Sequence, residues 1–109
     1  MDAVTSELAL SEVLVKPIAD GDLHKIQAYY NSFRNGKGLT VMPVDRSVLI
    51  EAASIRASTN LKLPDAIHFA TACLTNCTHF VTNDDHFKIA KSHRQIKVLP
   101  LQQLHLFFN

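Results

Sequence analysis

Strand-like and helix-like apolar patterns alternate along this chain. The run Ala3–Ser6 predicts a short strand, and apolar side chains then recur at helical spacing from about Leu8 until Pro17 ends the pattern. A second helix is predicted from Asp22 to Phe33. Its expected apolar stripe is Leu23, Ile26, Tyr29, Tyr30 and Phe33. The chain is therefore expected to open with a strand followed by two helices.

The middle of the chain repeats the change from strand to helix. Residues Leu39–Val44 predict a strand, and Asp45 is a suitable N-cap for the helix that follows, because its carboxylate can accept a bond from a free amide. Pro64 suits the first position of the next helix, which runs from Asp65 to about Leu74 and is apolar almost all round. Such a helix is expected to be buried.

The last third of the chain predicts two more strands, Thr78–Thr82 and Ile96–Leu99, with a short helix at His86–Ala90 between them. Strands that alternate with helices form a parallel sheet covered by helices. No repeat, low-complexity tract or linker interrupts the 109 residues, which suffice for one hydrophobic core. The fold class predicted is α/β, as a single domain over residues 1–109.

Charge and composition narrow the function classes. With 47% hydrophobic and 19% charged residues and a net charge of +1, the chain has no broad positive surface for nucleic acid, so such a contact needs a local patch. The basic residues considered for phosphate contacts are Lys16, Lys25, Arg34, Lys37, Lys88, Lys91 and Arg94. No signal peptide and no apolar run of membrane-spanning length occurs, which makes the cytoplasm the expected compartment.

Three acids lie near predicted strand ends or helix starts. Asp84 follows the third predicted strand, Asp65 opens the apolar helix, where the macrodipole favours a carboxylate, and Glu12 lies just beyond the first strand. Such positions meet at the sheet edge where α/β folds bind ligands. Because clustered carboxylates repel one another without a cation, the pattern predicts an oxygen-ligand site for Mg²⁺ or Mn²⁺. Thr82 and Asn83 could position a water or a phosphate.

Simpler interpretations exist for each of these acids. Asp65 could serve only as helix-start chemistry, Asp84 and Asp85 as turn residues, and Glu12 as a solvated side chain on a helix. For any one acid alone this interpretation is favoured, whereas the three together leave the two interpretations evenly matched.

His68, Cys73 and Cys77 also admit two interpretations. His68 follows Asp65 by one helical turn and could approach a metal or a substrate, but a packing role is favoured. The two cysteines share a helix face, yet no second cysteine pair accompanies them, so structural thiols are favoured over a metal site.

Three segments, in order, resemble the PIN domain, the nuclease fold of VapC-type toxins. They are SELALSEVL, LKLPDAIHFATA and THFVTNDDHF. The resemblance implies a three-layer α/β/α fold and an endoribonuclease that depends on Mg²⁺ or Mn²⁺, with an RNA substrate, an antitoxin protein as partner and a homodimeric assembly.

The resemblance also assigns roles to individual residues. Glu12, Asp65 and Asp84 resemble the second, third and fourth acids of the family's catalytic and metal-binding set. Thr82 resembles the hydroxyl residue that often precedes the last acid, and Asn83 and Asp85 are neighbours that could assist.

One part of the family pattern is missing. PIN domains open with a central strand that ends in an aspartate, and no segment of this sequence supplies it, since Asp2 precedes the second family strand. The sequence therefore predicts an N-terminally truncated PIN domain with weak or no ribonuclease activity and two unpaired strand edges. Either the two flanking strands close on each other, or a second copy covers them, and the homodimer is favoured. The apolar residues expected to support it are Leu101, Leu104, Phe107 and Phe108.

Two other functions remain open from the sequence. One is a non-catalytic PIN-derived module for binding or oligomerisation. The other is a small α/β interaction protein whose acids are only helix caps and turn residues.

Overall fold

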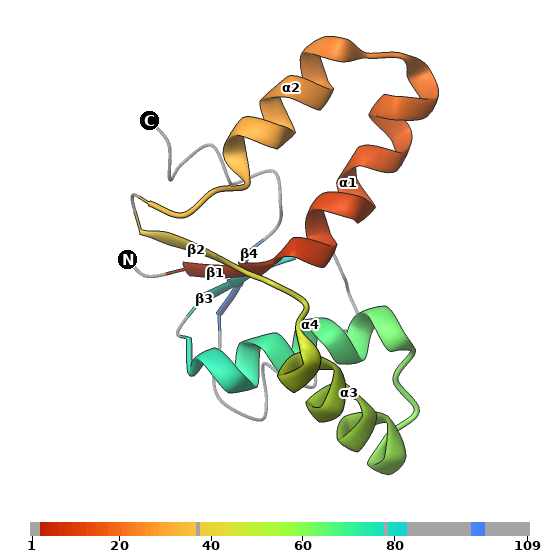
Figure 1. The fold of residues 1–109 in the computed structure, drawn as a ribbon, viewed down its shortest axis with the longest axis vertical. Helices are drawn as coiled ribbons and strands as arrows, with labels where there is room; N and C mark the ends of the chain where they lie inside the picture. Colours follow the sequence, from red (N-terminus) through yellow and green to blue (C-terminus); the bar gives the residue numbers. More distant parts are fainter. Residues whose placement is uncertain (1–2, 37, 78, 83–96, 100–109) are drawn as a thin grey trace.

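The computed structural model describes residues 3–36, 38–77, 79–82 and 97–99 (Figure 1). Strands and helices alternate as the sequence predicted. The elements are β1 (Ala3–Ser6), α1 (Glu7–Asp20), α2 (Leu23–Ser32), β2 (Leu39–Met42), α3 (Arg46–Ser58), α4 (Leu63–Thr75), β3 (His79–Val81) and β4 (Lys97–Leu99). The predictions for residues 86–90 and for the apolar positions 101–108 lie outside the described residues.

The four strands form one parallel sheet in the order β2-β1-β3-β4. β1 pairs with β2 over its whole length, from Ala3 opposite Leu39 to Ser6 opposite Met42. On its other side β1 pairs with β3, with Ala3 opposite His79 and Val4 opposite Phe80. The expectation of two unpaired strand edges is therefore wrong. β1 and β3, the two strands that were expected to have unpaired edges, pair with each other. Their buried backbone groups therefore have partners within the chain.

Helices cover both faces of the sheet, α1 and α2 on one and α3 and α4 on the other (Figure 1). Neighbouring strand residues point to opposite faces. Ala3 and Val81 accordingly belong to a core cluster beneath α1 and α2, and Val4 and Phe80 to a larger one against α3 and α4. The predicted α/β class with three α/β/α layers is confirmed.

Local capping residues fix where the helices begin. Ser6, at the end of β1, accepts a hydrogen bond from the amide of Leu8, so the chain passes from strand to helix without a loop. Asp22 caps α2 and Asp45 caps α3, each through a carboxylate oxygen that accepts an amide bond. Pro64 stands in the first turn of α4, where an amide would have no helical partner. The predicted role of Asp45 is confirmed, whereas Pro64 takes the second position of α4 and not the predicted first, because the helix begins at Leu63.

The predicted end of the first helix at Pro17 is wrong. α1 continues to Asp20 with Pro17 inside it, and Gly21 ends the helix in the left-handed conformation at φ 68°. A proline inside a helix removes one backbone hydrogen bond. Only three helical residues follow Pro17, and its carbonyl accepts a bond from the amide of Asp22 at 2.9 Å, just past the end of the helix.

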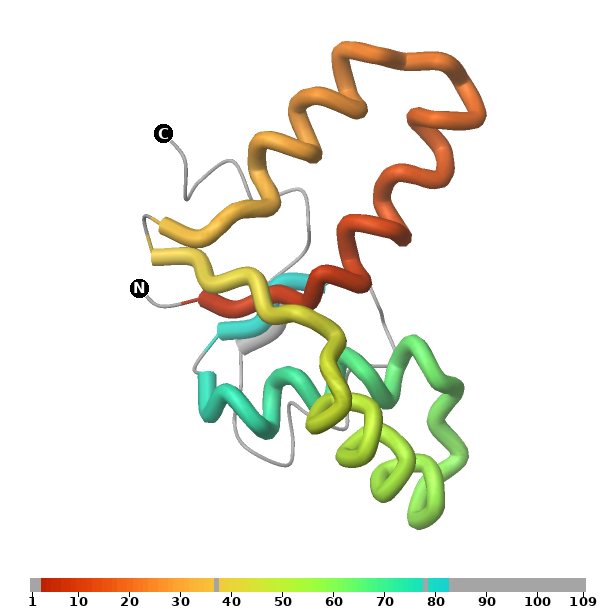
Figure 2. The backbone as a smooth tube through the Cα atoms, in the orientation of Figure 1, coloured from red at the N-terminus to blue at the C-terminus, as the bar shows by residue number. Residues whose placement is uncertain are grey.

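The predicted apolar stripe of α2 is only partly covered. α2 packs against α1, and the turn that joins these helices lies far from the sheet (Figure 2). Phe33 is 6% exposed, but Leu23 is 77% and Tyr30 66% exposed. Apolar spacing therefore located this helix correctly but did not show that much of its stripe faces outward.

Candidate active site at the carboxyl edge of the sheet

Successive strands are added first on one side of β1 and then on its other side. From β1 the chain passes through α1 and α2 to β2 on one side, and from β2 through α3 and α4 to β3 on the other. The carboxyl ends of β1 and β3 therefore border a topological switch point, the place where open α/β sheets bind ligands. The first turns of α1 and α4 both lie at this edge (Figure 1).

A hydrogen bond joins these two helices from opposite layers. His68 Nε2 lies 2.8 Å from Glu12 Oε1, and the two residues are 56 positions apart in the sequence. A carboxylate oxygen only accepts hydrogen bonds, so Nε2 carries the proton in this pair. The His68 side chain is fully buried, whereas the Glu12 side chain is 43% exposed. The pair therefore links the core to the surface at the carboxyl edge.

The imidazole of His68 also packs against the sheet. Its ring meets the ring of Phe80 edge-on, with 5.8 Å between the centroids and 68° between the planes. Phe80 is fully buried on β3. This contact and the hydrogen bond to Glu12 define the plane and the position of the imidazole.

Asp65 stands one turn before His68 in α4 and is half-buried. Residues three apart share a helix face, so Asp65 lies on the same face as the histidine that bonds Glu12. Its place in the first helical turn favours a charged carboxylate. Two of the three predicted acids, Glu12 and Asp65, therefore lie on α1 and α4, the two helices that the bond between Glu12 and His68 joins.

The strand ends beneath these helices are polar and closely bonded. Backbone pairing of β1 with β3 runs through Val4 and Phe80, and beyond it the Thr5 hydroxyl donates to the Val81 carbonyl at 2.9 Å. Thr5 is fully buried, and Thr82, the predicted hydroxyl residue, is 3% exposed directly after β3. A side chain therefore continues the connection between the strands at the carboxyl edge.

The donor atoms at this edge suit a hard divalent cation. Mg²⁺ is usually held by one or two carboxylates together with several waters, and Glu12 and Asp65 supply such oxygens. Within the described ranges, no three histidine, cysteine or acidic residues gather as a metal-holding group. Asp84, with Asn83 and Asp85, lies outside those ranges, so the convergence of Glu12, Asp65 and Asp84 stays a prediction.

The contact between Glu12 and His68 is the feature that sequence reasoning missed. The signal available was an ionisable residue, His68, within the apolar run of α4, one turn after Asp65. The other uncertain residues, Cys73 and Cys77, are half-buried, and Cys77 Sγ lies 3.8 Å from the carbonyl oxygen of Ala72.

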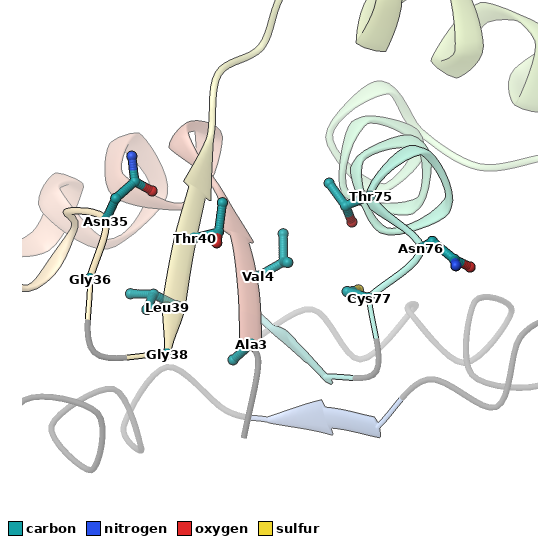
Figure 3. A pocket seen from close by; sticks show the side chains of 10 residues that line it. All are labelled: Ala3, Val4, Asn35, Gly36, Gly38, Leu39, Thr40, Thr75, Asn76 and Cys77. Atoms are coloured by element: carbon teal, nitrogen blue, oxygen red, sulfur yellow. The ribbon is translucent and has the colours of Figure 1, made fainter.

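A cavity of about 550 Å³ lies at the opposite, amino edge of the sheet. It is bordered by the starts of β1 and β2 and by the end of α4 (Figure 3). Its described lining residues carry no charge and are Ala3, Val4, Asn35, Gly36, Gly38, Leu39, Thr40, Thr75, Asn76 and Cys77. The cavity is thus separate from the predicted acids.

Comparison with known families agrees with this geometry. The profile of the PIN domain matches residues 2–92, so the chain belongs to the PIN domain family, whose members are nuclease-like proteins. No curated protein and no solved structure matches the chain. In the part of the chain that the structure describes, no helix is long and apolar enough to cross a membrane. The predicted family is confirmed, while the VapC type and the truncation stay predictions.

Proposed function

We propose that this protein is a divalent-metal-dependent endoribonuclease that hydrolyses RNA phosphodiester bonds at the carboxyl edge of its sheet. The observation that carries the proposal is the bond between Glu12 and His68, which brings the helix of one predicted acid against the helix of another. Membership of the PIN domain family supports the same reaction class.

Some residues of the proposed site would bind the metal ion, and others would assist by hydrogen bonding. Glu12 and Asp65 present carboxylate oxygens, and Asp84 is proposed to complete the set. When bound there, Mg²⁺ or Mn²⁺ supplies an activated water and neutralises charge on the phosphate. Thr82, Asn83 and Asp85 are proposed to assist by hydrogen bonding. The buried Phe80 packs edge-on against the ring of His68, the partner of Glu12.

The biological role proposed is that of a toxin paired with an antitoxin protein, which follows from the resemblance to VapC-type toxins. A homodimer is also proposed. Because β1 and β3 pair within one chain, the support now comes from apolar side chains exposed on α1 and α2. These are Val15, Ile18, Leu23 and Tyr30, each at least 60% exposed. Light scattering at micromolar concentration tests the assembly, and a monomer there would contradict it.

A nuclease assay with a metal titration tests the reaction. The purified chain is incubated with RNA in Mg²⁺, in Mn²⁺ and in a chelator, beside Asp65→Ala. Metal-dependent cleavage that Asp65→Ala abolishes supports the proposal. Mn²⁺ binding without any cleavage would favour the non-catalytic binding module. If the chain neither cleaves RNA nor binds Mn²⁺, the interpretation as a small α/β interaction protein is favoured.

A further inference from the structure

His68 is the most deeply buried ionisable group among the described residues. Its exposed fraction is 0%, and it belongs to a run of α4, Ala66–Ala72, that is buried throughout. Burying an imidazole costs free energy unless a hydrogen bond compensates. The bond to Glu12 at 2.8 Å provides one. Packing alone does not account for a histidine at this buried position, whereas its hydrogen bond to Glu12 does.

The two partners differ in freedom. The His68 ring is confined by Phe80 and by the buried face of α4. The Glu12 side chain is 43% exposed and has three rotatable bonds, so without a partner it would sample several rotamers. The fixed imidazole thus orients the mobile carboxylate, and not the reverse.

The bond from His68 occupies only one of the two oxygens of the Glu12 carboxylate. His68 engages Oε1 of Glu12, and the described structure records no other hydrogen bond or ion pair for this carboxylate. With one oxygen engaged by the protein, the other can take an external ligand. Asp65, one turn earlier on the same face of α4, places a second carboxylate next to this arrangement.

We propose that His68 is a positioning residue for the metal site. Through Nε2–H it holds one oxygen of Glu12, so that the other oxygen is presented to the divalent cation that Asp65 also approaches. The inference rests on the proposed function in one respect, since it takes Glu12 to be a metal ligand. Outer groups that orient a metal ligand usually change affinity roughly 10–100-fold when they are removed.

Direct Mn²⁺ binding by calorimetry tests the inference without any need for cleavage. His68→Met introduces an apolar side chain of similar length and removes the donor, and we expect it to bind Mn²⁺ roughly 10–100-fold more weakly. His68→Gln restores an amide donor near the place of Nε2, and we expect it to recover most of the affinity. The matched control is Thr71→Val. Thr71 is fully buried on the same helix, but its hydroxyl donates to the Ile67 carbonyl within α4 and not to Glu12.

A second measurement needs no metal. In the ¹⁵N spectrum of the metal-free chain, the His68 signal, assigned by its loss in His68→Gln, is expected to show protonation at Nε2. Glu12→Gln is expected to shift that signal. An Nδ1-protonated ring, or a signal that ignores Glu12→Gln, would overturn the inference even where His68→Met fails to fold.

The outcomes also separate this inference from the proposed function. If Glu12→Gln loses Mn²⁺ affinity while His68→Met keeps it, the positioning role is overturned and the metal site stands. If Thr71→Val weakens binding as much as His68→Met, the effect is one of packing and the positioning role is again overturned. A wild-type chain that binds no Mn²⁺ overturns the proposed function, and the inference with it.

Discussion

The two ends of the same sheet differ in their chemistry. At the carboxyl edge, Glu12, Asp65 and His68 place ionisable side chains from two helices at a switch point. At the amino edge, the cavity of about 550 Å³ has only uncharged residues among its described lining. Strand direction explains the difference. Helices that connect parallel strands start at the carboxyl edge, where their dipoles favour acids, and end at the amino edge, where carbonyl groups gather.

α4 shows both ends of this arrangement in one element. Its first turn carries Asp65, and its C-cap residue, Asn76, lines the cavity at the amino edge. A metal ion bound by carboxylates therefore fits one end of α4 and not the other. The comparison teaches that the two edges of one sheet offer a ligand different chemical groups, a carboxylate at the start of α4 and uncharged groups at its end.

The largest effect is expected from removing charge at the carboxyl edge. Glu12→Gln, Asp65→Asn and Asp84→Asn should each weaken Mn²⁺ binding by more than about 100-fold, because few oxygen ligands share the cation and an outer residue alone is worth roughly 10–100-fold. Calorimetry measures the affinity. Thr40→Ala at the amino edge, where Thr40 is exposed, is the control and should bind normally. Equal losses in Thr40→Ala and Asp65→Asn would remove the distinction between the two edges.

The next effect concerns stability and compares two threonines on neighbouring strands. Thr5→Val keeps the shape but removes the buried hydroxyl that donates to the Val81 carbonyl. Leaving such a carbonyl without its donor should lower the free energy of unfolding by about 1–3 kcal/mol. Thr40 is exposed on β2, so Thr40→Val should change that free energy by less than about 0.5 kcal/mol. Urea denaturation measures both, and similar midpoints for the two variants would show that the Thr5 bond adds little.

Local rules predicted much of this structure. Asp45 and Pro64 mark helix starts through chemistry confined to one turn, and the strand at Ala3–Ser6 has the predicted bounds. Asp65 was expected in a first helical turn for the same local reason, and the structure has it there. Such features need no knowledge of the rest of the chain.

Contacts between distant segments could not be predicted in the same way. The bond between Glu12 and His68 depends on how two helices from opposite layers meet at a sheet edge. The pairing of β1 with β3 depends on which strands end up adjacent, and strand periodicity does not encode adjacency. Likewise, the spacing of Leu23 and Tyr30 gives a helical stripe but not the surface that covers it.

The smallest effect is expected at the amino edge, where α4 ends. Asn76 has φ 53°, a left-handed conformation that asparagine and glycine adopt more easily than other residues. Asn76→Ala should therefore lower the free energy of unfolding by about 1 kcal/mol. Asn76→Gly is the matched variant, since it relieves the backbone conformation while removing the same side chain, and it should be more stable than Asn76→Ala.

Mn²⁺ affinity should stay unchanged in both Asn76 variants, because the substitution acts at the end of α4 opposite to Asp65. Thermal unfolding gives the stability and calorimetry the affinity. A loss of Mn²⁺ affinity in Asn76→Ala at temperatures where the chain is folded would show that the two ends of α4 are coupled. The proposal that only the carboxyl edge of the sheet takes part in metal binding would then need revision, since a substitution at the amino edge would also affect it.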